Sequence, residues 1–416
     1  MASVCFYFQV HQPYRIKKYK FFNIGQDHNY FNDASDTSLN NARILDRVSI
    51  KSYLPTNAIL LELLKKHPEF KLSFSLSGVF LDQIEKGFPE VLASFQRLVK
   101  TGRVEILSET YYHSLAFLYS KTEFKAQVLK HRRKVKKLFN VVPQVFRNTE
   151  LIYNNDVAKM AEEMGFKGII TEGVDRILDW QSPNFLYSPQ GTKKIKLLLK
   201  NYKLSDDIAF RFSEKSWSEH PLTSEKFSHW VTSHNGNGEV INLFMDYETF
   251  GEHQWEHTGI FDFLRSLPGE VLKHGQNDFV TPSEAVDRYP VRAELNIENF
   301  ISWADEERDL SAWRSNPIQE DALNKIYSME ESVLRTKDSK IIEDWRKLQT
   351  SDHFYYMCIK WFADGDVHKY FNPYESPYDA FIAFMNVLQD LELRVENILR
   401  GSIAVNPILN NAKQII

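Results

Sequence analysis

The feature that most constrains the fold is an alternation of two kinds of segment over roughly the first 290 residues. Short runs rich in β-branched and aromatic residues alternate with longer runs whose apolar residues recur at helical spacing. This pattern predicts βα units and a parallel sheet or barrel. The expected strands are Val4–Val10, Lys71–Leu76, Arg103–Leu107, Gln144–Arg147, Gly168–Thr171, Lys194–Leu199 and Val240–Met245. About seven such repeats favour a (β/α) barrel of seven or eight strands over an open, doubly wound sheet.

Helical patterns separate the expected strands and then take over the chain. Between the strands they lie at Asn57–Lys66, Leu81–Lys100, Lys121–Leu138 and Asp156–Gly165. After about Asp305 the strand signals end, and helices are expected at Gln319–Leu334, Lys340–Gln349 and Tyr378–Leu399. We therefore expect an α/β chain with a barrel over residues 1–290. A helical C-terminal domain over residues 291–416 is expected to pack on the barrel and complete its cleft.

Composition narrows the classes of ligand and the compartment. Lys and Arg number 51 against 55 Asp and Glu, so the basic footprint of a nucleic-acid-binding protein is missing. Tyr (19) and Trp (8) are plentiful, and such rings suit sugar binding, although on composition alone an aromatic core is the better explanation. The two cysteines, Cys5 and Cys358, lie in apolar runs, which predicts neither a disulfide nor a zinc thiolate. With no leader and no apolar run long enough to span a bilayer, a cytoplasmic location without membrane contact is expected.

Polar residues that directly follow the expected strands are the candidates for a site. In barrels of this kind, the active site lies at the carboxyl ends of the strands. The residues in question are His11, Gln12, Ser75, Ser77, Glu109, Tyr111, Tyr112, His113, Glu150, Glu172, Asp206, Asp207, Asp246 and Glu248. A single loop carboxylate is more often a solvated loop acid or a helix cap than part of a site. Acids that follow several separate strands at one rim would repel one another unless some are paired, protonated or used.

Two of these carboxyls suit glycoside hydrolysis. That reaction needs one carboxyl group to attack the anomeric carbon or activate water, and another to protonate the leaving oxygen. Glu150 and Asp246 both follow apolar strand runs, and apolar surroundings raise the pKa of a carboxyl towards neutrality. Glu248 competes with Asp246, because residues two apart on a continuing strand share a face. Spacing alone leaves this choice open.

Four segments together resemble the first four signature motifs of glycoside hydrolase family 57. They are His11-Gln12-Pro13, the run from Gly102 to His113, Arg147-Asn148-Thr149-Glu150, and the run from Phe244 to Gly251. Ser351-Asp352-His353-Phe354-Tyr355-Tyr356 is similar to the fifth motif, and Ile301–Trp313 resembles the α-amylase group of that family. One His-Gln-Pro carries little information. The ordered set, from residue 11 to about 356, is specific.

The resemblance implies a (β/α)7 barrel, a distorted form of the TIM barrel, followed by a helical domain. It also implies retaining chemistry on α-1,4-glucans without a cofactor or catalytic metal, with Glu150 as nucleophile and Asp246 as acid/base. Retention predicts carboxyl groups about 5 to 6 Å apart. The substrate-binding residues expected are His11, Gln12, Glu109, His113, Glu248, Trp255, Trp303, Asp352 and His353. Where this chain has His113, glucanotransferase relatives commonly have a glutamate, which leaves the role of His113 open.

Several alternatives stand beside this interpretation. The same catalytic pair serves a 4-α-glucanotransferase, in which another glucan replaces water as acceptor. A glucan-binding protein with weak turnover would retain the same cleft. His253 and His257, four apart, could share a helix face and hold zinc, which would suit a metal-dependent carbohydrate deacetylase. The glutamate that follows the first histidine of metalloprotease helices is replaced by Gln254. The sequence does not determine the oligomeric state.

Overall fold

The computed structural model describes residues 1–31, 33–273, 275–360 and 367–411, the last ten of these by their backbone only. The chain divides into two compact units. The barrel unit comprises Met1–Gln12, Leu45–His113 and Thr122–Leu310, and the helical unit comprises Pro13–Ile44, Ser114–Lys121 and Ser311–Ile416. The chain therefore leaves the barrel unit directly after Gln12 and again after His113. The packing of a helical domain against the barrel stays a prediction.

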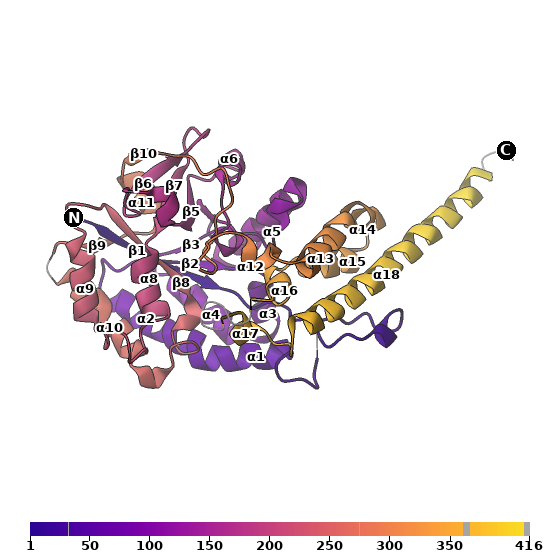
Figure 1. Ribbon diagram of the computed structural model, residues 1–416, viewed down its shortest axis with the longest axis horizontal. Coiled ribbons are helices and arrows are strands. Elements are labelled where there is room, and N and C mark those ends of the chain that lie inside the picture. The colour runs from indigo at the N-terminus through magenta and orange to yellow at the C-terminus, as the bar shows by residue number, and fades with distance from the viewer. Residues whose placement is uncertain (32, 274, 361–366, 412–416) are drawn as a thin grey trace. The chain divides into compact units, whose positions relative to one another are not determined.

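Seven parallel strands pair into a closed ring, which confirms the (β/α)7 fold, and helices surround these strands (Figure 1). They are β1 (Ser3–Val10), β2 (Leu72–Leu76), β3 (Val104–Ile106), β4 (Val145–Arg147), β5 (Gly168–Glu172), β7 (Lys196–Lys200) and β8 (Val240–Asp246). Parallel pairing runs from β8 through β1 and β2 to β3, and from β4 through β5 and β7 back to β8. A parallel bridge between Ser108 and Phe146 joins β3 to β4 and completes the ring.

Three strands were not predicted. β6 (Leu186–Pro189) pairs antiparallel with β7 and parallel with β10 (Val291–Leu295), and β9 (Asp278–Phe279) pairs parallel with β1. β9 has only two residues, and most of β10 is exposed, so neither carries the apolar run that marks a buried strand. Because β10 and the residues up to Leu310 belong to the barrel unit, this unit continues beyond residue 290.

Most helices of the barrel unit lie between its strands. The first of them, α1, begins four residues before the stretch of the barrel unit that starts at Leu45. They are α1 (Asn41–Val48), α2 (Leu54–Lys66), α3 (Gly78–Gly87), α4 (Pro89–Val99), α5 (Lys121–Phe139), α6 (Asn155–Glu163), α7 (Asp175–Leu178), α8 (Tyr202–Ala209), α9 (Ser224–Ser233), α10 (Ile260–Leu272) and α11 (Pro282–Arg288). The prediction of a single helix over Leu81–Lys100 is wrong, because α3 ends before Phe88 and a new helix, α4, begins at Pro89. Proline lacks the N–H of a helix interior but fits the first turn.

The helical unit contains α12 (Ser311–Arg314), α13 (Pro317–Ser328), α14 (Glu330–Thr336), α15 (Ser339–Lys347), α16 (Ser351–Tyr355), α17 (Val367–Phe371) and α18 (Pro377–Asn411). The one helix expected over Gln319–Leu334 is two, separated at Met329. The buried carboxylate of Asp390 on α18 ties the early chain to this unit. It accepts hydrogen bonds from Gly25 N at 2.6 Å, from His28 Nδ1 at 2.8 Å and from the hydroxyl of Tyr30.

An apolar layer fills the interior of the barrel. Its members come from six of the seven strands or their ends: Tyr7, Leu107, Val145, Ile170, Leu198 and Phe244. All belong to one buried cluster, and the rings of Tyr7 and Phe244 stack with centroids 4.8 Å apart. Since alternate residues of a strand point to the same face, the residue two positions further on from each of these also points inward, nearer the carboxyl end.

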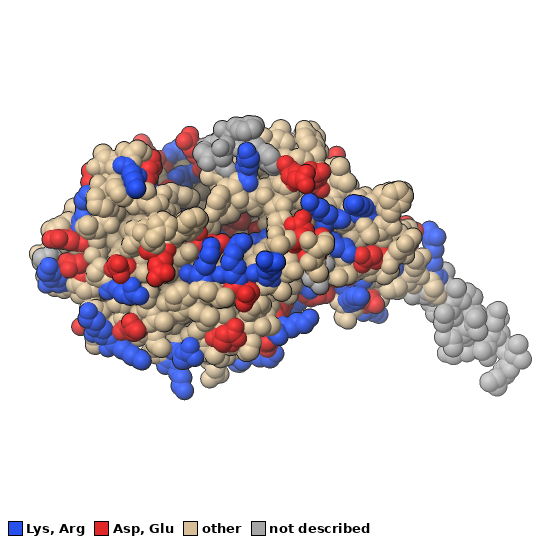
Figure 2. Space-filling view, turned by 90° about the horizontal axis from the view of Figure 1, so that it is seen from below, with Lys and Arg blue, Asp and Glu red and all other residues tan. Residues whose placement is uncertain are grey.

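Charged side chains of both signs share the surface. Basic and acidic residues are interspersed over the face seen in Figure 2. Lys134 on α5, for example, lies 2.6 Å from both Asp82 and Glu85 on α3. Among the described helices, none combines the length and apolar character needed to cross a membrane. The expected lack of nucleic-acid and membrane partners stays a prediction.

Candidate active site

A polar layer lies immediately above the apolar layer of the barrel. Its members follow the apolar residues by two positions: Gln9, Glu109, Arg147, Glu172, Lys200 and Asp246. Contacts between them confirm the shared face, because Arg147 Nη1 lies 3.7 Å from Glu109 Oε2 and Lys200 Nζ lies 3.3 Å from Glu172 Oε2. The carboxyl ends of separate strands thus bring acids and bases into one small volume, as barrel enzymes require.

His113 joins two of the predicted carboxylates. Its Nδ1 donates to Glu109 Oε2 at 2.9 Å, and its Nε2 donates to Glu150 Oε1 at 3.3 Å. Burial opposes the charged imidazolium, but the two carboxylates outweigh it and raise the pKa of His113 to about 9. Burial likewise opposes ionisation of Glu109, yet His113 and Arg147 lower the pKa of this carboxyl to about 2. His113 is therefore a cation at neutral pH, placed against Glu150.

Glu150 is held from both sides in an unusual backbone conformation. It has φ of 57°, and Leu151 has φ of 52°, both in the left-handed region that non-glycine residues rarely occupy. The indole Nε1 of Trp303 donates to Glu150 Oε2 at 2.7 Å, and the Trp303 amide donates to the Glu150 carbonyl at 3.2 Å. The side chain keeps 16% of its surface exposed. Strained backbone held by surrounding contacts is frequent at catalytic positions.

His11 and Gln12 of the first motif lie beside this pair. The His11 ring stacks on that of His113 with centroids 4.0 Å apart, and its Nδ1 lies 2.7 Å from the Ser77 hydroxyl. Gln12 Nε2 donates to Tyr53 Oη at 3.2 Å and to Glu248 Oε1 at 3.4 Å. The structure therefore brings His11 to the rim next to His113. Gln12 contacts Glu248 instead.

Asp246 and Glu248 differ in their surroundings. Asp246 ends β8, is partly exposed, and receives no hydrogen bond on its carboxyl from the described residues. Burial and then the charge of Glu150 raise its pKa to about 7, against the lowering effect of Arg147, His113 and Lys200. Glu248 is buried in the short 3-10 helix η5 (Tyr247–Thr249), where the Tyr53 hydroxyl donates to it. Burial and the charge of Asp246 raise its pKa to about 8.

Arg147 forms a cationic floor under these groups. Its side chain is fully buried, and none of its guanidinium nitrogens has a hydrogen-bond partner among the described residues. The guanidinium lies over the rings of Phe244 and Trp303, 5.3 and 5.8 Å from their centres. Aromatic faces attract a desolvated cation. Burial lowers the pKa of Arg147, while Glu109, Glu150 and Asp246 oppose that shift.

Three further predicted residues, Trp255, Asp352 and His353, are described by contacts of their own. Trp255 is 56% exposed, in the segment after β8, with Lys51 Nζ 5.8 Å from its ring centre. Asp352 and His353 belong to α16 of the helical unit, where the buried His353 ring lies 5.9 Å from that of Phe384. Roles for these three in sugar binding stay predictions.

The hypothetical zinc helix is absent from the described chain. His253 precedes the short 3-10 helix η6 (Glu256–Thr258), which contains His257, so the two imidazoles do not share an α-helical face. Within the residues that the structure describes, no group of three or more His, Cys, Asp or Glu side chains is arranged to hold a metal ion.

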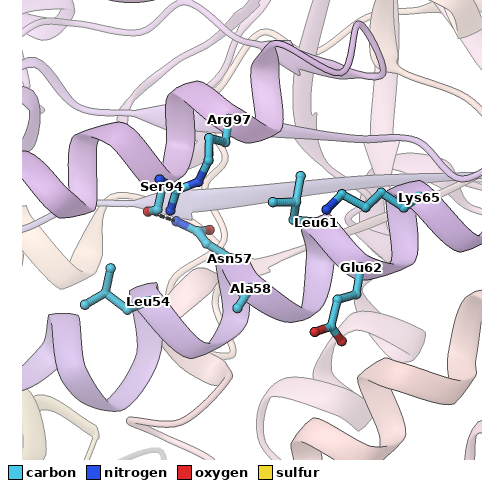
Figure 3. A pocket seen from close by; sticks show the side chains of 8 residues that line it. All are labelled: Leu54, Asn57, Ala58, Leu61, Glu62, Lys65, Ser94 and Arg97. Carbon is cyan, nitrogen blue, oxygen red and sulfur yellow. Dashed lines mark hydrogen bonds between the residues drawn. The ribbon is translucent and has the colours of Figure 1, made fainter.

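A separate cavity of about 220 Å³ opens between α2 and α4 (Figure 3). Its lining residues are Leu54, Asn57, Ala58, Leu61, Glu62, Lys65, Ser94 and Arg97. Asn57 donates to the Ser94 hydroxyl at 2.7 Å and accepts a hydrogen bond from Tyr247 at 2.6 Å. With only one carboxylate in its lining, this cavity lacks the paired acids of glycoside hydrolysis.

Sequence reasoning missed Gln9, Arg147 and Lys200 as members of the site. All three lie on strands that were predicted, two residues after an apolar interior residue. Applying the two-residue periodicity to the last positions of each strand would have identified them. The contact of Trp303 with Glu150 spans 153 residues, and no local pattern signals it.

Fold and site together define a glycoside hydrolase, with Glu150 and Asp246 inside a seven-stranded barrel. The chain belongs to the glycosyl hydrolase family 57, whose model matches residues 5–298. It is 44% identical over 412 residues to a Methanocaldococcus jannaschii protein named provisionally as an α-amylase, covering 96% of this chain and 86% of that one.

Two solved structures are similar in fold. A branching enzyme of this family from Pyrococcus horikoshii matches with a TM-score of 0.66 and 14% identity, over 86% of this chain and 85% of that one. A 4-α-glucanotransferase from Thermococcus litoralis matches with a TM-score of 0.63 and 17% identity, over 85% of this chain. The chain spans 56% of the length of that glucanotransferase.

Proposed function

We propose that this protein is a retaining glycosidase that cleaves α-1,4-glucans by double displacement, with Glu150 as nucleophile and Asp246 as acid/base. The single observation that carries the proposal is the contrast between the two carboxyls. Glu150 is held by the cationic His113 and by Trp303, whereas Asp246 has a pKa raised to about 7. One group is thus stabilised as an anion, and the other keeps its proton up to a pH of about 7.

In the first step Asp246 donates its proton to the glycosidic oxygen while Glu150 attacks the anomeric carbon. The bond between that carbon and the leaving oxygen breaks, and a glycosyl ester of Glu150 forms. The ester carries no charge, so the repulsion that raises the pKa of Asp246 disappears. The Asp246 carboxylate then takes a proton from the acceptor, whose oxygen displaces Glu150.

The acceptor decides between two activities of the same pair. Water gives hydrolysis, as the name of the M. jannaschii relative suggests, and a glucan hydroxyl gives transfer, as in the T. litoralis enzyme. We propose hydrolysis, on the higher identity of the relative named as an α-amylase. A cytoplasmic location fits the two free, buried cysteines and belongs to the same proposal.

The test compares wild type with Glu150→Gln on maltoheptaose and on soluble glucan, with chelator present. Chelator-resistant cleavage that disappears in the variant is expected, and proton NMR should show first-formed products that retain the α-anomeric configuration. A ladder of products shorter than the substrate supports hydrolysis, whereas products longer than maltoheptaose support transfer. First-formed β-anomers, or full activity in Glu150→Gln, would overturn the proposal.

A further inference from the structure

The segment that carries Trp303 is a loop closed on itself. Ile301 exchanges two backbone hydrogen bonds of 2.9 Å with Tyr153 at the start of the loop. Ser302 then bonds forward, from its amide to the Arg308 carbonyl at 3.1 Å and from its hydroxyl to the Asp309 carbonyl at 2.6 Å. Arg308 has a positive φ of 49°. The loop from 301 to 309 therefore brings Arg308 back towards the barrel.

Arg308 enters a cluster of four charged side chains, of which Glu172 and Lys200 are buried and Asp206 and Arg308 are half-buried. Its Nη1 lies 3.1 Å from Glu172 Oε2, and its Nη2 lies 3.7 Å from Asp206 Oδ2. Lys200 Nζ lies 3.3 Å from the same Glu172 oxygen and 3.4 Å from Asp206 Oδ1. The side chains are 0% (Glu172), 5% (Lys200), 16% (Asp206) and 16% (Arg308) exposed. Two cations thus balance two anions.

The cluster and the nucleophile share one neighbour. Lys200 Nζ lies 5.4 Å from the ring centre of Trp303, whose indole N–H donates to Glu150 Oε2 at 2.7 Å. Outside the cluster, the Arg308 guanidinium lies over the ring of Tyr202, 4.0 Å from its centre. The charges therefore fix the loop at Arg308, five residues beyond Trp303. Breaking a buried ion pair by removing one partner is costly, so such a cluster holds its members in one arrangement.

We propose that Arg308 is a positioning residue: with Glu172, Asp206 and Lys200 it anchors loop 301–309 so that Trp303 holds Oε2 of Glu150 and leaves Oε1 to attack the sugar. The chemical part of this inference rests on the proposed function. The asymmetry of the Glu150 contacts supports it, because Trp303 donates to Oε2 at 2.7 Å whereas His113 lies 3.3 Å from Oε1.

The assignment of the two oxygens is consistent through the reaction. When Oε1 bonds to the anomeric carbon and the glycosidic bond breaks, Oε2 becomes the carbonyl oxygen of the ester. A carbonyl oxygen still accepts the Trp303 hydrogen bond. Oε1 of Glu150 changes from a charged carboxylate oxygen to the bridging oxygen of an ester, which accepts hydrogen bonds poorly. Only its contact with His113, the longer of the two, therefore weakens. Trp303 can thus hold Glu150 in both states.

The kinetic experiment compares Arg308→Gln with Arg265→Gln, which removes a surface arginine paired with exposed Asp262. Arg308→Gln should lower kcat roughly 10- to 100-fold with little change in KM, since misplacing a reacting group costs this much. The acid limb of its pH profile should move to higher pH, because the Glu150 carboxylate loses the fixed hydrogen bond from Trp303 and its pKa rises. Trp303→Phe should show the same shift, and the double variant should lose no more than the single ones.

A second variant, Arg308→Lys, separates the positioning role of Arg308 from a general loss of folding. Arg308→Lys retains the charge but cannot reach both carboxylates as the guanidinium does, so it should show the limb shift with native thermal stability. Two outcomes would overturn the assignment of Arg308. One is a loss of kcat in the Arg308→Gln/Trp303→Phe double variant that equals the product of the two single losses, and the other is an unchanged acid limb of the pH profile in Arg308→Lys.

A second measurement is independent of turnover. Hydrogen exchange of the Trp303 indole N–H, assigned by its loss in Trp303→Phe, should be slow in wild type and in Arg265→Gln but fast in Arg308→Lys. Slow exchange in all three would overturn the anchoring role even in an active enzyme. If wild type proves inactive on glucans while the exchange difference is found, the proposed function fails and the anchor stands.

Discussion

Asp246 and Glu248 lie two residues apart, yet among the described residues only Glu248 receives hydrogen bonds on its carboxyl, donated by Tyr53 and Gln12. The strand ends at Asp246, and the 3-10 turn that follows directs Glu248 towards Tyr53 and Gln12. The sequence left a choice between these two acids. The structure leaves the Asp246 carboxyl partly exposed and without a hydrogen bond from the described residues, which suits the proton donor proposed above.

Replacing these two acids should separate their roles. Asp246→Asn should lower kcat/KM by about 10³-fold on glucans, within the range that general acid catalysis contributes. Azide should restore turnover of an activated maltosyl fluoride, because a small anion reaches the ester without a base. Glu248→Gln, the matched control, should keep activity within about tenfold and show no azide effect. Equal losses in the two variants would contradict the assignment of Asp246.

The positive charge of His113 should influence the alkaline limb of the pH–activity profile, because it lowers the pKa of Asp246. Asp246 must be protonated for the first step, so kcat/KM of wild type should fall as pH rises through about 7. His113 is cationic up to about pH 9 and lowers the pKa of Asp246. His113→Gln removes that positive charge, so the pKa of Asp246 rises and the alkaline limb should move to higher pH. Initial rates across pH 5–10 measure this, and a limb that moves down would contradict the geometry.

Gly251 should tolerate no side chain. It has φ of +104°, and a Cβ built on it would lie 2.0 Å from the Lys51 carbonyl oxygen, which is backbone. Gly251→Ala should therefore cost about 3 kcal/mol of unfolding free energy, from both conformational strain and overpacking. Gly102, with φ of +75° and no atom within 4 Å of a built Cβ, gives the control. Gly102→Ala should cost only about 1 kcal/mol, and equal losses in urea denaturation would refute the close approach.

The barrel was predictable because its strands carry their own signal. The seven barrel strands were predicted to within two residues at each end, since buried parallel strands are continuous apolar runs. The helix break at Pro89 was also readable in the sequence and was overlooked. β10 was not predictable in this way, because its mostly exposed residues depend on pairing with β6.

The site was predictable where it follows a strand and unpredictable where it depends on distant loops. Glu150 and Asp246 were singled out from their positions after apolar runs, and their catalytic roles stay predictions. The roles of Trp303 and Arg308 depend on a loop that meets the barrel more than 100 residues further along the chain. Neither propensity nor spacing encodes such a contact.

The division of the chain into units has a consequence for synthesis. The helical unit joins residues 13–44 to residues after 311, and Asp390 bonds Gly25, His28 and Tyr30 across more than 350 positions. During translation the early segment emerges long before α18 exists. A nascent chain that has completed its barrel strands therefore still holds residues 13–44 without the carboxylate that fixes them. Translation past Asp390 is the step that lets this unit close.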